Sequence, residues 1–167
     1  MNIQKITIEN FKSIYEPLEL DFNDIKGFWK ISGSVGAGKT TIGEAIIFGL
    51  FGTVGGKNNS DLISWGKKHG LIEIWLTTKG RNLYVKRELN AYGQSPIYVE
   101  VDGEELVFTN KRDAQVQLEK EYYDTLEQKF RETYGWEKVY QAYHIIYNQK
   151  NVIAALPQDQ IRLQKLA

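Results

Sequence analysis

The fold of this chain follows from one stretch, Gly33-Ser34-Val35-Gly36-Ala37-Gly38-Lys39-Thr40. Its order, Gly-x4-Gly-Lys-Thr, is that of a P-loop, in which glycines let backbone amides point into a small concavity that holds phosphate oxygens. A helix beginning near Lys39 adds its N-terminal amides and the positive end of its dipole. We therefore expect a nucleoside triphosphate, ATP with Mg²⁺, with Lys39 reaching the β- and γ-phosphates and Thr40 ligating the metal.

The segments on either side of the loop have the patterns that a P-loop requires. The short apolar run 28–32 predicts a buried strand that leads into the loop. From 39 to 51, apolar residues cover most of a helix circumference, which is typical of a buried helix. Gly52 ends this helix, and the polar, glycine-rich segment 53–60 predicts a loop. The result is the strand–loop–helix order of a P-loop fold.

The rest of the chain predicts further strands and then helices. Alternating apolar residues indicate strands over 3–10 and 18–22, and an antiparallel meander over 71–108 with turns at Lys79-Gly80 and Asp102-Gly103. Asn110 is the expected N-cap of an amphipathic helix that ends at Gly135. Apolar residues recur along that helix every four positions at Ala114, Leu118, Tyr122, Leu126 and Phe130. A mixed segment, 136–148, precedes a last helix that opens at Pro157.

Composition narrows the class of protein. The 167 residues carry 21 basic and 21 acidic side chains, so no global charge draws the chain to nucleic acid or membrane. The sequence has no cysteine, which excludes disulfides and thiolate metal sites, and its two histidines are too few for a metal site. The N-terminus lacks the apolar core of a signal peptide, and no apolar run approaches the ~20 residues that span a bilayer. We expect a cytoplasmic protein with no membrane partner.

We predict an α/β fold of the P-loop NTPase class, formed as a single domain over 1–167. The predicted parts are a P-loop core over about 1–66, a β meander over 67–110 and a helical part over 111–167.

Several motifs in this order resemble a known family. The order is Asn10-Phe11-Lys12-Ser13, the P-loop, Thr41-Ile42-Gly43-Glu44-Ala45-Ile46 and Gly49-Leu50-Phe51-Gly52. Together they resemble the N-terminal half of the ABC-class ATPase head of SMC-like proteins. More narrowly, the chain is similar to SbcC-type subunits of the double-strand-break repair nuclease and to their phage recombination-endonuclease counterparts. The likeness continues through 61–66, 84–87 and a Q-loop-like segment that ends at Gln149 and is followed by Arg162.

The resemblance implies roles for particular residues. Lys39 and Gln149 take the catalytic roles, and Thr40 and Gln149 ligate Mg²⁺. The implied nucleotide-binding residues are Lys12, Ser13, Gly33, Ser34, Val35, Gly36, Ala37, Gly38, Lys39, Thr40, Thr41, Ile63, Ser64 and Trp65. Gln149 follows Lys39 by 110 positions, a separation that fits DNA-repair heads better than transporter heads.

The resemblance also implies partners and a longer protein. Hydrolysis in such heads needs an Asp-Glu pair and a signature Ser-Gly-Gly segment that lie after a coiled coil, so we expect this chain to be an N-terminal portion with an incomplete ATPase site. The implied partners are the C-terminal half of the same head, a second head joined through ATP, a nuclease subunit and DNA. Val35 departs from the asparagine usual at its position, which puts turnover in question.

Other interpretations of single features stay open at the level of sequence. Val99-Glu100-Val101-Asp102 superficially matches the missing acidic strand, although Asp-Gly favours a hairpin turn. Glu44 faces the magnesium shell or acts as a first-turn carboxylate that favours the helix dipole. The basic residues of the meander bind DNA phosphates or lie on a solvated face; they are Lys67, Lys68, His69, Lys79, Arg81, Lys86 and Arg87.

Two other functions compete with the repair ATPase. The first is a non-hydrolytic nucleotide-binding or scaffold module of an SMC- or RecF-like protein, motivated by Val35 and the missing catalytic carboxylate. The second is a P-loop kinase, which the lack of a lid-like arginine pattern disfavours.

Overall fold

A computed structural model describes residues 2–23, 33–55 and 57–123, and its centre is an antiparallel sheet. Six strands pair in the order β2-β1-β3-β4-β5-β6, and every neighbouring pair is antiparallel. The strands are β1 Asn2–Glu9, β2 Leu18–Asp21, β3 His69–Thr78, β4 Arg81–Asn90, β5 Ile97–Val101 and β6 Glu104–Glu105. Both predicted N-terminal strands and the predicted meander are confirmed.

Tight turns set the register of the meander. Lys79 and Gly80 have φ of 49° and 73°, and Asp102 and Gly103 have φ of 50° and 86°. Two consecutive left-handed residues form the turn that matches the twist of a two-residue hairpin, so both predicted turns are confirmed. Alternate side chains of the strands then face one side and build the core, including Ile6 and Ile8 of β1 and Ile72, Ile74 and Leu76 of β3.

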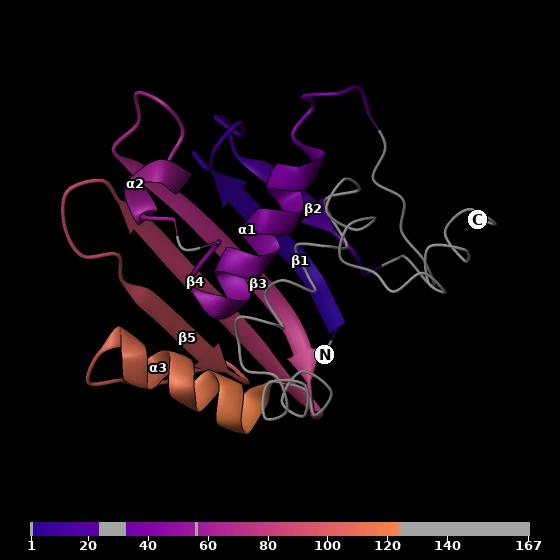
Figure 1. Cartoon of the computed structure of the whole chain (residues 1–167). Coiled ribbons are helices and arrows are strands. Elements are labelled where there is room, and N and C mark those ends of the chain that lie inside the picture. Colours follow the sequence, from indigo (N-terminus) through magenta and orange to yellow (C-terminus); the bar gives the residue numbers. More distant parts are fainter. Residues whose placement is uncertain (1, 24–32, 56, 124–167) are drawn as a thin grey trace, which may run out of the picture.

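The helix that follows the P-loop lies across this apolar face of the sheet (Figure 1). It is α1, Lys39–Phe51, as predicted, and Gly52 ends it in a left-handed conformation with its N–H bonded to the Phe48 carbonyl at 2.7 Å. Gly49 lets the helix approach the sheet closely, because a Cβ there would overlap Ile74 and lie 3.0 Å from Cγ2 of Ile72.

One predicted loop is wrong in part. Residues 53–60 were expected to be a loop, but the single-turn helix α2, Asn59–Leu62, begins inside it. Tertiary contacts hold this turn: Leu62 is fully buried, and Asn59 Nδ2 donates to Ser95 Oγ at 2.8 Å. A polar, glycine-rich pattern does not reveal such contacts, since packing overrides local propensity.

The helix expected to run from Asn110 to Gly135 is correct at its start only. Asn110 caps α3, Lys111–Gln117, through its side-chain oxygen, which accepts from the N–H groups of Arg112 and Asp113, each at 3.0 Å. A π-helical turn, η1 Leu118–Tyr122, follows, and Tyr123 is extended. The wider turn advances the buried position by one residue, so Tyr123 is buried while Tyr122, expected in the core, is only half-buried.

Several predictions fall outside the described residues and stay predictions. They are the strand over 28–32, the helix beyond 123, the segment 136–148, the helix from Pro157, and Gln149 with Arg162. The assignment of 1–167 to one domain is likewise untested. Within the described ranges, no helix is both long and apolar enough to cross a membrane.

Gly49→Ala is expected to destabilise the fold by about 1–3 kcal/mol, the cost of overpacking a filled core. The added methyl group would overlap the Ile74 side chain. The double variant with Ile74→Val, which removes the nearest atom, should be more stable than the sum of the two single losses predicts. Urea unfolding of the natural protein, the two single variants and the double variant measures these losses. If the losses of the single variants simply add in the double variant, the contact between position 49 and Ile74 is contradicted.

Asp102→Asn is expected to lower stability at neutral pH and to matter less in acid. The carboxylate accepts from the Asn82 N–H at 2.8 Å and from Arg81, and these bonds hold its pKa below its ordinary 3.8. Its ionised form therefore contributes stability above pH ~4, which is lost as pH falls through the folded pKa. Unfolding free energies across this range should converge for the two proteins at low pH, and a pH-independent difference would refute the assignment.

Candidate functional site

Two glycines of the predicted P-loop have the left-handed backbone conformation for which glycine is suited. Gly36 and Gly38 have φ of 85° and 80°, conformations that residues with a side chain rarely adopt. Ala37 N–H donates to the Ser34 carbonyl at 3.2 Å, which closes the loop, and Gly38 is the N-cap of α1. The first N–H groups of a helix have no intrahelical acceptor, so they are available to an anion at this end.

Lys39 turns back over the loop that precedes it. Its Nζ donates to the carbonyls of Gly33 at 2.7 Å and Ser34 at 2.6 Å. The ammonium is thus held next to the backbone amides that would face a phosphate. A phosphate oxygen offers this cation a stronger, charge-assisted hydrogen bond than a neutral carbonyl does.

The other predicted loop residues are accessible. Gly33, Ser34, Val35, Gly36, Ala37 and Thr40 are all exposed, and Val35 is fully so. Thr40 is the second residue of α1 and is exposed. Thr41 points the other way and is buried.

Lys12 and Ser13 lie against the first turns of α1, and their implied contact with a nucleotide stays a prediction. Ser13 Oγ is 3.0 Å from Thr41 Oγ1, and Lys12 Nζ pairs with Glu44. A short loop makes this possible: Phe11 pairs with both Ile14 and Ile63, and Lys12 itself has φ of 52°. The contacts at the start of α1 therefore come from two segments, the loop after β1 and the helix itself.

The structure decides one of the two roles that the sequence left open for Glu44, and the role in the magnesium shell stays a prediction. It lies beyond the first turn of α1, so the interpretation as a dipole-favouring first-turn carboxylate is wrong. Its side chain is about 5% exposed and bonds Lys12, whose side chain is 25% exposed. Its described role is a largely buried ion pair that fixes the Phe11 loop on α1.

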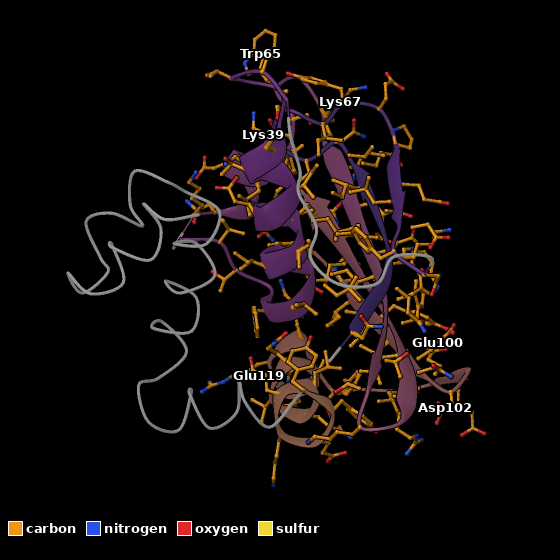
Figure 2. All side chains as sticks on the ribbon, turned by 90° about the vertical axis from the view of Figure 1, so that its right-hand side faces the viewer. Lys39, Trp65, Lys67, Glu100, Asp102 and Glu119 are labelled. Atoms are coloured by element: carbon orange, nitrogen blue, oxygen red, sulfur yellow. The ribbon has the colours of Figure 1, made fainter. Side chains whose placement is uncertain are left out.

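The predicted trio Ile63, Ser64 and Trp65 separates into two kinds. Ile63 and Ser64 are buried, and Ser64 joins the Phe11 loop through its N–H to the Asn10 carbonyl and its Oγ to the Ile14 carbonyl, both at 3.0 Å. Trp65 is 90% exposed and lies at the same end of the molecule as Lys39 (Figure 2). Trp65 is the member of the trio whose ring a ligand can reach.

Asp102 forms part of a hairpin and not of the nucleotide site. It lies in the turn between β5 and β6, at the end of the molecule opposite Lys39 (Figure 2). Its carboxylate is bonded to Arg81 and the Asn82 N–H. The turn interpretation is confirmed over the acidic-strand alternative.

The basic residues of the meander do not form one surface. Arg87 is buried on the inner side of β4, Arg81 pairs with Asp102, and Lys86 pairs with Glu88 at 3.1 Å. The DNA-phosphate interpretation is therefore wrong for the buried Arg87, and it stays a prediction for the exposed Lys67, Lys68, His69 and Lys79. Among the described residues, no group of three His, Asp or Glu is placed to hold a metal.

Sequence reasoning missed a buried polar cluster at the other end of α1. Arg87 Nε donates to the Gly49 carbonyl at 2.7 Å and its Nη2 to Gln115, while Gln115 Nε2 and Tyr123 OH both donate to the Leu50 carbonyl. Burial lowers the pKa of Arg87 and raises that of Tyr123. The signal was present, since Arg87 occupies an inward position in the alternating strand.

Comparisons with known proteins give a consistent result. The family model described as an AAA domain matches residues 5–167. The Rad50 ATPase of DNA double-strand break repair from Saccharolobus solfataricus is 35% identical over 92 residues, which cover 54% of this chain and 10% of the relative. Exonuclease subunit 2 of Escherichia phage RB69 is 30% identical over 124 residues, covering 71% of this chain and 21% of the relative.

A solved structure agrees on the fold. The recombination mediator protein RecF with ATP superposes with a TM-score of 0.54 at 20% identity, covering 65% of this chain and 29% of that one. The α/β P-loop ATPase fold is thus confirmed. The chain spans only about a tenth of the archaeal relative and a fifth of the phage relative.

Lys12→Met is expected to destabilise the protein by about 2–3 kcal/mol, because it leaves the Glu44 carboxylate buried without its cation. Adding Glu44→Leu should recover most of that loss. Lys86→Met, which breaks the more exposed pair with Glu88, should cost less than ~1 kcal/mol. Chemical unfolding compares the free energies of unfolding of the four proteins. Equal losses in the two lysine variants would show that the Lys12–Glu44 pair stabilises the fold no more than the exposed pair does.

Proposed function

The chain belongs to the AAA domain family, and from this premise we propose that it is the P-loop-bearing part of an ATP-binding head in an ATPase that processes DNA ends. The resemblance to SMC-like repair ATPases and their phage counterparts, predicted from the motifs, is confirmed by the matches to Rad50 and to phage exonuclease subunit 2. The function of those relatives supports the DNA-repair assignment.

One observation carries the nucleotide assignment: the left-handed glycines and the start of α1 converge with Lys39 on one small volume. Phosphate oxygens accept from the loop amides, and Lys39 exchanges the Gly33 and Ser34 carbonyls for the β- and γ-phosphates. Ser13 and Lys12 support this geometry from the adjoining loop. The site so formed selects a polyphosphate over a single anion.

Two further contacts complete the proposed ATP site. Mg²⁺ would neutralise charge between the phosphates, and we propose the Thr40 hydroxyl and Gln149 as its two protein ligands. The exposed indole of Trp65 lies at the same end and offers a flat apolar surface to the adenine base. Ile63 and Ser64 act behind it by fixing the loop that bears it.

Hydrolysis is proposed to need residues from outside the described part. Asp102, the carboxylate that the sequence allowed, lies at the far end of the molecule from Lys39. A water-activating acid has to reach the γ-phosphate within hydrogen-bond distance. We therefore propose that the C-terminal half of the head, a second head joined through ATP, and a nuclease subunit supply turnover and DNA cleavage.

A non-hydrolytic scaffold role is the second candidate. Val35 favours it, because this fully exposed apolar side chain lies at the crest of the loop where the family carries an asparagine. A complex with the completing half that binds ATP without turnover, and that gains turnover on Val35→Asn, would support this role.

Lys39→Ala is expected to weaken Mg-ATP binding at least about tenfold, since it removes a charge-assisted contact worth about 1.5–3 kcal/mol. Calorimetry with and without Mg²⁺ measures the affinity. Lys111→Ala, at the first position of α3 and remote from the P-loop, removes the same charge and should bind like the natural protein. Unchanged ATP affinity in Lys39→Ala would reject the phosphate site.

A further inference from the structure

The strand register assigns a second set of side chains to the sheet face that is turned away from α1. We call this set the outer face. Registered partners share a face, so the outer face is traced from Lys5 through Trp75 and Tyr84 to Glu100 across four strands. Figure 2 shows Glu100 on the side of the strands away from α1.

The outer face is strongly acidic, although the whole chain is neutral. Its carboxylates are Glu9, Glu19, Asp21, Glu73, Glu88, Glu100 and Glu105, and its cations are Lys5 and Lys86. Seven negative and two positive charges leave a formal charge of −5. Both lysines are already paired, Lys5 with Glu19 at 2.7 Å and Lys86 with Glu88 at 3.1 Å. This surface repels nucleic acid phosphates and attracts cations.

An aromatic ladder crosses the same face. Trp75 and Tyr84 have ring centroids 4.9 Å apart, Tyr84 and Tyr98 are 6.0 Å apart, and Lys5 Nζ lies 4.8 Å from the Trp75 ring. Tyr84 donates to Glu73 at 2.5 Å and Tyr98 to Glu100 at 2.6 Å. Flat rings bordered by carboxylates suit guanidinium groups, which stack on aromatics and pair with carboxylates in a planar fork.

A pocket on this face supplies an unused acceptor. Its volume is about 220 Å³, and it is lined by Glu9, Asn10, His69, Gly70, Leu71, Lys86, Glu88 and Asn90. Asn10, one of these lining residues, has a buried Oδ1 that accepts no hydrogen bond within the described residues. Asn10 Nδ2 donates to Glu9 Oε1 at 3.4 Å. A ligand that donates a hydrogen bond to this oxygen would satisfy it.

We propose that the outer face docks an arginine-bearing, extended basic polypeptide segment of a protein partner, with one guanidinium in the pocket beside Glu9 and Asn10. The guanidinium has five N–H donors and no acceptor, which matches two carboxylates and an amide oxygen. Further arginines of the segment stack along the Trp75–Tyr84–Tyr98 ladder. This surface is independent of the nucleotide site, which opens at the end of α1.

The test uses the full chain and a hexa-arginine peptide, with binding measured by calorimetry at low and high salt. Glu9→Gln with Glu88→Gln should weaken binding roughly fivefold, the effect of two partly exposed ion pairs. The matched control, Asp61→Asn with Glu121→Gln, removes the same charge from α2 and η1 and should leave the affinity unchanged. Hexa-lysine should bind more weakly, since an ammonium is a point charge that does not form the planar fork.

Three results would overturn the proposal. The first is an equal loss of peptide affinity in the control variant, and the second is equal affinity for hexa-lysine and hexa-arginine. The third is a single-stranded oligonucleotide that displaces the peptide and that binds the Glu9/Glu88 variant more weakly than the natural protein. Unchanged Mg-ATP affinity in the Glu9/Glu88 variant verifies that the fold is intact. Loss of peptide binding without loss of ATP binding separates this surface from the nucleotide site.

Discussion

The buried guanidinium of Arg87 is the constraint around which the described structure is arranged. Burying a cation is costly unless its donors are satisfied, and here the carbonyls at the C-terminal end of α1 accept from it. Those carbonyls are the negative end of the helix dipole, so the position suits a cation. Arg87 also donates to Gln115 of α3, and Tyr123, which follows η1, donates to the Leu50 carbonyl at the same helix end. The helix end, the sheet and the π-helical turn are therefore fixed by a single charge.

Fixing one end of α1 has consequences at the other. A 13-residue helix is about 20 Å long and is stiff on that scale. Gly49 sets its distance from the sheet, and Lys12 and Ser13 hold its first turns. The backbone amides that we propose to face a phosphate thus belong to an element held at three points along its length. Donors fixed in advance do not have to be ordered when the ligand binds, which lowers the cost of binding.

The features that the sequence predicted are those that local chemistry decides. Glycine at positive φ, the apolar circumference of α1, strand alternation, the Asp102-Gly103 turn and the Asn110 cap each depend on a few neighbouring residues. What could not be predicted depends on distant partners. Asn59 of α2 bonds Ser95, and Tyr123 after the π-helical turn bonds the Leu50 carbonyl. Glu44 pairs with Lys12, which lies 32 positions away in the sequence. An inward arginine in an apolar strand was the one visible sign of such coupling.

The zero net charge of the chain concealed an acidic sheet face. Because the outer face carries −5, the rest of the chain carries a formal +5, with 19 basic and 14 acidic residues. The apolar core under α1 lies between the acidic face and the helix whose N-terminus favours anions. A polyphosphate at the P-loop is therefore not repelled at close range by those carboxylates, and beyond a Debye length of about 8 Å salt screens what remains. One sheet can in this way present opposite electrostatic preferences at two sites.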